Sequence, residues 1–400
     1  MNTDIESLKD AVCAEVDRLA PQLLKASHDI HAHPELNFEE HYAHDLLTDL
    51  LEQAGLATHR HAYGAETAFE ARAGDTGFDI AVLCEYDALP TIGHACGHNI
   101  IATAGLGAGL AAAAVAQRAG GRLRIMGTPA EEGGGGKIVM ARNGAFEGVD
   151  AAMMVHPADA DLIRMDTIAL QTVDVEFHGK AAHAAAAPHE GRNALDAAVL
   201  GYMNVAALRQ HIGPNERIHG IFTKGGDKAN IVPAETEMNW IVRSQTIASL
   251  QPLKDRVLQC FGGAAAACGC TTSSTWNTHT YADMIDNGPM VASYVANSSR
   301  LGRSVVDPTV LGRRVVGSTD MGNVSYLVPS IHPMIKTAPD GVAIHTVDFA
   351  RWAISPLANR AIIDGAKAMA MTVLDLWCDP NLMNDTKEAF SRRPTNVEVL

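Results

Sequence analysis

The chain has 400 residues, 47% of them hydrophobic and 19% charged, which is enough apolar sequence to bury more than one core. With 46 acidic and 31 basic residues, its formal charge of −15 argues against a nucleic-acid partner or an anionic membrane surface. The first residues, MNTDIESLKDAVCAEV, carry acids where a secretion signal has basic residues, and the seven cysteines show no framework spacing. We therefore expect a two-domain cytoplasmic protein without nucleic-acid or membrane partners.

The first part of the chain alternates helical and strand-like segments. Apolar residues at helical spacing predict helices, and short apolar runs between them predict strands. The expected helices cover 4–26, 39–54, 99–118 and 136–144, and the expected strands cover 67–74, 78–86, 121–129 and 149–157. This rhythm is typical of an α/β fold with a mostly parallel sheet flanked by helices. Asp87, Glu131, Glu132 and His156 each follow a predicted strand, where such sheets bind ligands.

From about residue 167 the pattern changes to strand, helix, strand, strand, helix, strand. This order matches the split, ferredoxin-like α+β unit. We therefore expect a domain inserted at 167–281, with 1–166 and 282–400 forming the first domain around it. The polar tail after about residue 379 is expected to be loose.

Five residues of the first domain have the side chains of a metal site: Cys96, His98, Glu132, His156 and His345. Thiolate, imidazole and carboxylate groups are ligands for zinc, manganese, cobalt or nickel. If one residue bridges two ions, the five side chains supply three bonds to each ion. A shared water or hydroxide then completes both shells and becomes the reactive oxygen of a hydrolytic site.

Glu131 lies directly beside Glu132, and adjacent side chains on a turning backbone point in different directions. One carboxylate can therefore hold metal while the other acts as general base toward the polarised water. The glycines at 133–136 let the backbone approach this centre closely.

Each of these elements also has a purely structural interpretation. An isolated Cys-x-His pair, two glutamates before glycines and a histidine that ends a strand all occur without a metal. Among 18 histidines some fall near cysteines by chance. The histidines at 28, 31, 33, 41 and 44 are expected on an exposed polar face.

Six motifs in a fixed order carry a family resemblance. They are EYDALPTIGHACGHN, GTPAEEGGGGK, MMVHP, FHGKAAHAAAAPHEGRNALDA, KANIVPAETEMNWIVRS and GSTDMGNVSYLVPSIHP with the following AIHT. Together they resemble the M20 metallopeptidase family, in its aminoacylase-like amidohydrolase branch. The motifs are most similar to a dipeptidase-like subgroup, the M20 domain-containing protein 2 group. The likeness runs from HPELNFEE at 33–40 to HTVDF at 345–349.

The resemblance implies a zinc-peptidase-like catalytic domain that holds two divalent ions. Cys96 would be the bridging thiolate, with His98 and His156 completing one shell and Glu132 and His345 the other. Glu131 would then be the general base. His332, in SIHP, is an alternative last ligand, but HT at 345–346 fits the closing motif of the family better.

The resemblance also assigns a role to the inserted domain, as a lid that dimerises. His183, in GKAAHAAA, would enter the active site of the partner chain and stabilise the oxyanion. Asn230 and Arg243 would contact the substrate, with Arg243 clasping a carboxylate. His178 and His189 are alternatives to His183, and an ordinary strand-end salt bridge is the alternative for Arg243.

The loop GSTD at 317–320, with Ser318 and Thr319, borders the substrate in the family.

The sequence departs from the pattern of the family at two places. Glu85 and Asp87 replace the usual Asp-x-Asp before ALP, so a carboxylate that orients the ligands comes from a longer side chain at the first position. Asn99 replaces the more common aspartate after the histidine and removes a negative charge near the metals.

These features together predict a dimeric, dinuclear metal hydrolase that cleaves an amide bond to an amino acid. N-acyl amino acids, aminoacyl dipeptides and conjugates such as aminobenzoyl-glutamate require the same machinery. Two alternatives belong to other classes. One is a metal-independent cysteine hydrolase with Cys96 as nucleophile, and the other is a non-catalytic protein that captures such conjugates.

Overall fold

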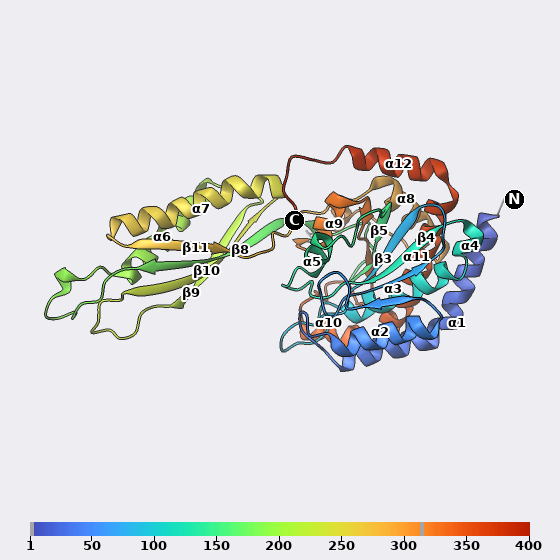
Figure 1. Cartoon of the computed structure of the whole chain (residues 1–400), viewed down its shortest axis with the longest axis horizontal. Coiled ribbons are helices and arrows are strands. Elements are labelled where there is room, and N and C mark those ends of the chain that lie inside the picture. Colours follow the sequence, from blue (N-terminus) through green and yellow to red (C-terminus); the bar gives the residue numbers. More distant parts are fainter. Residues whose placement is uncertain (1–3, 313–315) are drawn as a thin grey trace. The chain divides into compact units, whose positions relative to one another are not determined.

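The structure is a computed structural model that describes residues 4–312 and 316–400 (Figure 1). The chain forms two compact units. The first contains residues up to 166 together with 284–395, and the second contains 167–283 with 396–399. The second unit therefore interrupts the first in sequence. None of the helices in the described ranges is long and apolar enough to cross a membrane.

A six-stranded sheet lies at the centre of the first unit, in the order β1-β2-β4-β3-β5-β13. Strands β4, β3, β5 and β13 run parallel, whereas β1 and β2 are antiparallel additions at one edge. The strands are β1 (Thr58–Arg60), β2 (Phe69–Ala73), β3 (Asp79–Cys84), β4 (Arg122–Gly127), β5 (Ala151–Met153) and β13 (Ser330–Ile331). The predicted α/β fold with a mostly parallel sheet is confirmed.

The strand expected over 149–157 is two strands instead of one. After β5 the chain leaves the central sheet, and β6 (His156–Ala158) pairs in parallel with β14 (Met334–Lys336) in a separate sheet. Pro157 has no N–H to donate, which suits a short two-stranded ladder better than the middle of a large sheet. The break turns His156 away from the line of β5.

Helices cover both faces of the sheet in Figure 1. The helices described in the first unit are α1 (Ile5–Ala32), α2 (His41–Gln53), α3 (His98–Ala113), α4 (Ala116–Ala119), α5 (Gly136–Arg142), α8 (Gly288–Arg300), the 3-10 helix Pro308–Leu311, α9 (Met321–Leu327), α10 (Val347–Trp352), α11 (Pro356–Cys378) and α12 (Pro380–Ser391). Helix α3 is apolar on every side and packs against α1, α11 and β3. A helix without a polar face is stable only when it is buried, so α3 forms the centre of the core.

Helix α1 continues six residues beyond its predicted end. Ile30 is buried and extends the apolar face of the helix by one more turn. The His28 ring bonds Asn359 Oδ1, and the His31 ring bonds the Ala350 carbonyl, at 2.8 Å each. These contacts to α11 and α10 hold the last turn of the helix in place.

The prediction of an exposed face for His44 is wrong. This residue is buried, and its ring is stacked on that of His61 with the centroids 4.9 Å apart. Its neighbour on the same side of α2, Leu47, is also buried. Helix α2 therefore turns His44 toward the core.

The tail after residue 379 forms a helix instead of a loose end. Asp379 accepts hydrogen bonds from the first N–H groups of α12, and Pro380 occupies the first helical turn. Both are favourable start signals for a helix. Met383 and Thr386 are buried, so one side of α12 packs against α8 and α11.

The second unit is an antiparallel sheet covered by two helices. Its sheet order, β11-β8-β10-β9, is that of a ferredoxin-like fold and agrees with the predicted succession of elements. The elements are β8 (Ala169–His178), the 3-10 helix Pro188–Glu190, α6 (Ala194–Leu208), the 3-10 helix Arg209–His211, β9 (Arg217–Lys224), β10 (Glu235–Ser244), α7 (Ile247–Ala267) and β11 (Thr271–Trp276). Phe177, Trp240 and Phe261 fill the space between the sheet and the helices. Two further short strands, β7 (Asp166–Thr167) and β12 (Val316–Gly317), lie outside the four-stranded and six-stranded sheets.

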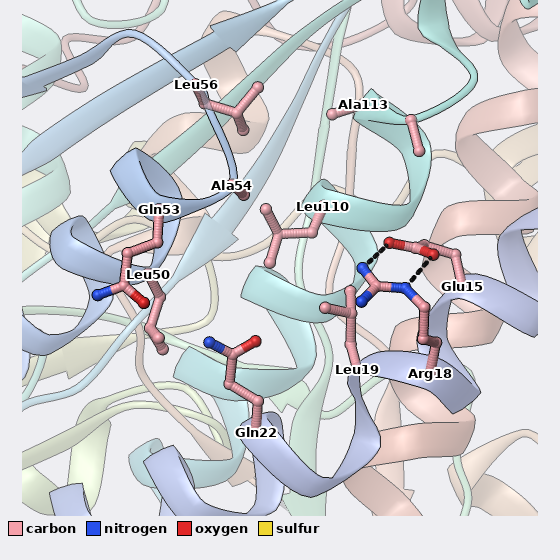
Figure 2. A pocket seen from close by; sticks show the side chains of 11 residues that line it. Glu15, Arg18, Leu19, Gln22, Leu50, Gln53, Ala54, Leu56, Leu110 and Ala113 are labelled. Atoms are coloured by element: carbon pink, nitrogen blue, oxygen red, sulfur yellow. Dashed lines mark hydrogen bonds and ion pairs between the residues drawn. The ribbon is translucent and has the colours of Figure 1, made fainter.

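A surface pocket of about 420 Å³ lies between α1, α2 and the end of α3 (Figure 2). Leu19, Leu50 and Leu110 form its apolar wall. Arg18 lines it too, and its guanidinium is paired with Glu15 on the same helix. The described residues that line this pocket include none that the sequence predicts to carry chemistry.

Candidate metal centre

Three neighbouring strands deliver the predicted site residues to one edge of the central sheet. Strand β3 is followed by Glu85 and Asp87, β4 by Glu131 and Glu132, and β5 by His156. Because β4, β3 and β5 are adjacent and parallel, their carboxyl ends meet at the same edge. Residues far apart in the sequence are thereby brought together at the strand ends.

Cys96 and His98 reach this edge through the turn that starts α3. Gly97 between them has a φ of 81°, and a side chain there would meet Pro157 Cγ at 2.7 Å. Only glycine combines this left-handed conformation with so close a neighbour. The turn places the thiol and the imidazole on the same side, although they are two residues apart.

Two groups of potential ligands share Cys96. The first is Cys96, His98 and His156, and the second is Cys96, Glu132 and His345, with the ligand atoms of each group within 4.8 Å of one another. The Cys96 sulfur lies 3.4 Å from His156 Nε2 and 3.3 Å from His345 Nε2. Glu132 Oε1 lies 3.2 Å from His345 Nε2. This is the division into two shells that the family resemblance implies.

His345 comes from a distant loop, 249 residues after Cys96. Its backbone N–H donates to the Ala95 carbonyl at 2.8 Å, and its φ of 63° is unusual for a residue with a side chain. His332, the alternative ligand, lies in neither group, and its ring centroid is 5.3 Å from that of His156. Of the two alternatives, His345 is therefore the one that lies in a group of potential ligands.

Asp87 links the two ligand groups without belonging to either. Its Oδ1 lies 2.9 Å from His98 Nδ1, and its Oδ2 accepts the backbone N–H of Glu132 at 2.9 Å. Although burial opposes the charged form, His98 holds the pKa of Asp87 below its usual value. A carboxylate that bonds the rear nitrogen of a ligating histidine fixes its tautomer and its ring orientation. Asp87 therefore contacts one residue of each group of potential ligands.

A buried lysine that the sequence pattern did not reveal lies behind the centre. The Lys137 ammonium is fully buried, bonds Glu85 Oε2 and donates to Asp320 Oδ1 at 2.7 Å. The second Glu85 oxygen lies 3.2 Å from His98 Nε2. The longer side chain at position 85 therefore spans the distance from a ligand to Lys137. A charged residue that ends a run of four glycines is the only sequence signal for this network.

Glu131 is the acidic group best placed to move a proton. It is only 9% exposed, and a carboxylate oxygen lies within 4.8 Å of ligand atoms of Glu85 and His98. Burial, followed by the charges of Glu85 and Glu132, raises the pKa of Glu131 well above its usual value. A carboxyl group with a raised pKa beside a hydrolytic centre suits a general base that later returns its proton.

The donor atoms fit a pair of divalent cations. Among the described residues, His98 Nε2 and Glu132 Oε1 are two of the buried side-chain atoms that make no well-aligned hydrogen bond, although Glu85 Oε1 and His345 Nε2 lie 3.2 Å from them. Such atoms are costly to bury unless something binds them. One sulfur, three imidazole nitrogens and one carboxylate form a set of donors typical of zinc, manganese, cobalt or nickel.

The predicted substrate residues occupy two places. His183, Asn230 and Arg243 belong to the second unit, where the Ala184 N–H donates to the Asn230 carbonyl at 3.1 Å and so joins the first two segments. Ser318 and Thr319 belong to the first unit. Thr319 is buried, and its hydroxyl accepts the N–H of Met321 at 3.1 Å, so it fixes the start of α9.

Comparisons with known proteins show which proteins this chain resembles. The chain is 39% identical to the mouse (Mus musculus) Xaa-Arg dipeptidase over 99% of this chain and 95% of that protein. It is 30% identical to one of the p-aminobenzoyl-glutamate hydrolase subunits of Escherichia coli, over 89% of each chain. A dinuclear metal binding peptidase from the M20 family of Bacillus subtilis has the same fold, with a TM-score of 0.68, 17% identity and coverage of 90% of this chain and 99% of that chain.

The named relatives place this chain among the hydrolases that act on peptide or amide bonds. Residues 84–350 match the family described as Peptidase family M20/M25/M40, and the chain belongs to this family. The predicted family and its dipeptidase-like subgroup are thereby confirmed.

Proposed function

We propose that this chain is a metallohydrolase that cleaves the amide bond between an acyl or aminoacyl group and an amino acid. The observation that carries the proposal is the pair of ligand groups that share Cys96 beside a buried Glu131. A thiol common to both groups has no evident structural purpose, whereas it is the natural bridge between two ions. Two divalent ions would supply Lewis acidity, which polarises the scissile carbonyl and acidifies a water.

The residues of the chain divide the remaining work. Glu131 takes the proton from the attacking water and returns it to the departing nitrogen. Asp87 keeps His98 and the Glu132 backbone in place while charge develops. Arg243 on β10 binds the carboxylate of the amino-acid product, because a guanidinium group can donate two parallel hydrogen bonds to a carboxylate.

The names of the relatives support a proposal for the substrate class. One cleaves dipeptides, as its name Xaa-Arg dipeptidase states, and another is named for p-aminobenzoyl-glutamate. We propose dipeptides with a basic carboxyl-terminal residue as the preferred substrates, because the identity to the dipeptidase is higher and covers nearly the whole chain. N-acyl amino acids and aminobenzoyl-glutamate are the competing classes.

A substrate panel on metal-reconstituted protein tests this proposal. The expected kcat/KM for dipeptides ending in arginine or lysine exceeds that for the same dipeptides ending in leucine by at least about tenfold, since a leucine side chain cannot make the charge-assisted hydrogen bonds that a basic side chain makes. Aminobenzoyl-glutamate and N-acetyl amino acids serve as controls. If no member of the panel is cleaved faster with added metal than after chelation, the proposed reaction is wrong.

We further propose that the second unit forms a homodimer and supplies His183 to the partner chain. Large apolar side chains are exposed on α6 and on the edge strand β9, namely Val199, Leu200, Met203, Ile221 and Phe222. An exposed sheet edge beside apolar residues is a common pairing surface. His183 Nδ1 accepts two backbone N–H groups at 3.2 Å, so the neutral ring carries its proton on Nε2 as an oxyanion donor.

Mixed dimers give a direct test of this arrangement. We expect His183→Ala and Glu131→Gln chains to be nearly inactive alone and to recover about a quarter of wild-type activity when coexpressed in equal amounts with different affinity tags. Half of the dimers would then be mixed, and one of the two sites in each would be complete. The absence of recovery in dimers that carry both tags would place His183 in its own site or outside catalysis.

A cytoplasmic location is proposed on the cysteines. All seven are free thiols in the structure, and three of them, Cys84, Cys96 and Cys270, are buried. A reducing compartment keeps such thiols available as ligands. Recovery of the active protein from the membrane or secreted fraction of its cells would contradict this location.

A further inference from the structure

A buried carboxylate outside the proposed catalytic residues points to the loop that carries the two glutamates. Glu40 has no exposed surface, and both of its oxygens are used. Its Oε1 accepts the backbone N–H of Ala130 at 2.8 Å, and its Oε2 accepts the hydroxyl of Thr67 at 2.7 Å. Ala130 lies ninety residues further along the chain, directly before Glu131.

A helix cap does not account for this carboxylate. Glu40 precedes α2, but within the described part of the chain its side chain makes no hydrogen bond to the N–H groups at the start of that helix. Burial raises the pKa of Glu40 to about 7, because the charged carboxylate is unfavourable away from water. An apolar residue at this position would avoid that free-energy cost. The hydrogen bonds of the carboxylate must offset this cost, and one of the two is made to the backbone N–H of Ala130.

Ala130 is held in an unfavourable conformation. Its φ of 59° lies in the left-handed region, which a residue with a side chain seldom adopts. Its carbonyl accepts N–H groups of Gly134 and Gly136 at 3.2 Å each, so the loop folds back on this residue. A side chain at Gly136 would meet the Pro129 carbonyl oxygen at 1.8 Å. The loop can close in this way only with Ala130 left-handed and glycine at position 136.

The two glutamates thus lie between two anchors. Glu40 holds the N–H of Ala130 on one side, and Asp87 holds the N–H of Glu132 on the other. A rotation of the backbone at Glu131 would break one of these hydrogen bonds. Strained residues of this kind persist at functional sites when their surroundings hold them.

We propose that Glu40 is a positioning residue, which locks Ala130 in its left-handed conformation and thereby aims Glu131 and Glu132 at the metal centre. The role of those two glutamates rests on the proposed function. The lock itself is a property of the loop in the free protein. The lock depends on the geometry of the hydrogen bonds of Glu40 and not on its charge. A neutral side chain of the same shape should therefore work in place of Glu40.

Three variants at position 40 separate shape from charge. Glu40→Gln keeps an oxygen for the Ala130 N–H and an amide for Thr67, and its kcat should stay within about threefold of wild type. Glu40→Ala removes the contact, and Glu40→Asp retains the charge but is too short. In both, kcat at saturating metal should fall about 10- to 100-fold while KM changes less than about threefold. Glu40→Asp carries the test if Glu40→Ala does not fold.

Amide hydrogen exchange of the metal-free protein supplies a readout that needs no activity. In Glu40→Ala, the amides of residues 130–136 should exchange at least about tenfold faster than in wild type, with α3 unchanged. Thr67→Val is the matched control, because it removes the other partner of Glu40 and leaves the Ala130 contact. It should leave exchange at 130–136 within about threefold of wild type.

A second substitution tests the strain directly. Glycine at position 130 has no penalty for the left-handed conformation. The double variant Glu40→Ala with Ala130→Gly should therefore recover part of the kcat that Glu40→Ala alone loses. The proposal is overturned if Glu40→Ala and Glu40→Asp turn over like wild type, if Glu40→Gln is as slow as Glu40→Ala, or if exchange at 130–136 does not change. A wild-type protein without hydrolase activity defeats the proposed function alone, since the exchange result still decides the lock.

Discussion

Glu131→Gln should retain both metal ions and lose about a thousandfold or more in kcat. The glutamine is close to the glutamate in size, so the ligands beside it have no reason to move. What it cannot do is accept a proton from water at neutral pH and return it to the leaving nitrogen. Elemental analysis and steady-state kinetics on the same preparation measure both halves of this expectation.

The neighbouring carboxylate provides the matched control. Glu132→Gln changes the same chemical group one residue away, at a position that belongs to a ligand group together with Cys96 and His345. It should reduce metal content as well as turnover, whereas Glu131→Gln reduces turnover alone. Equal metal loss in both variants, or normal turnover in Glu131→Gln, would remove Glu131 from the role of general base.

The sequence was enough to predict that the residues of the candidate site lie close together, because these residues follow short-range rules. Glu131, Glu132 and His156 lie just beyond apolar strands, and the carboxyl ends of neighbouring parallel strands must meet. Cys96 and His98 lie within one turn of each other, so their proximity needs no knowledge of the fold. His345 required the resemblance to a family, since nothing in its local sequence distinguishes it from His332.

The supporting residues were missed for the opposite reason. Glu40 lies in a polar stretch before a helix, where a glutamate is usually exposed, and its partner Ala130 lies ninety residues away. Lys137 meets Asp320 across 183 residues, and a lysine after glycines is ordinarily solvated. Burial of such groups depends on long-range packing, which a single sequence does not display. The same limit explains why His44 was wrongly expected on the surface.

These buried groups have a common purpose in the fold. Asp87 fixes ligands of both shells, Lys137 joins Glu85 to Asp320 at the start of α9, and Glu40 fixes the loop before Glu131. Each connects the end of one strand to a different segment. Because these contacts are made to backbone N–H groups and carboxylates of neighbouring loops, they hold His98 and the loop of Glu131 and Glu132 in place without a cation. A preorganised site of this kind loses little conformational entropy on binding metal.

The strongest consequence of the shared thiol is that Cys96→Ala and His345→Ala should differ in metal content. Cys96 belongs to both ligand groups, so its removal leaves two ligands on each side, and we expect fewer than about one ion per chain. His345 belongs to one group, and its removal leaves Cys96, His98 and His156 intact to hold about one ion. Both variants should lose at least about a thousandfold in activity, because the paired centre is gone in each.

The same measurements distinguish the proposed metallohydrolase from a cysteine hydrolase. The two imidazole nitrogens at 3.3 and 3.4 Å from the Cys96 sulfur are also compatible with a thiol activated by a histidine base. Such an enzyme needs no metal, so a chelator would leave its rate untouched, and Cys96→Ala would be inactive with unchanged metal content. A metallohydrolase instead loses its activity on chelation and regains it with a divalent ion. Since His345→Ala leaves the thiol in place, one remaining ion in that variant and almost none in Cys96→Ala would identify the sulfur as the bridge.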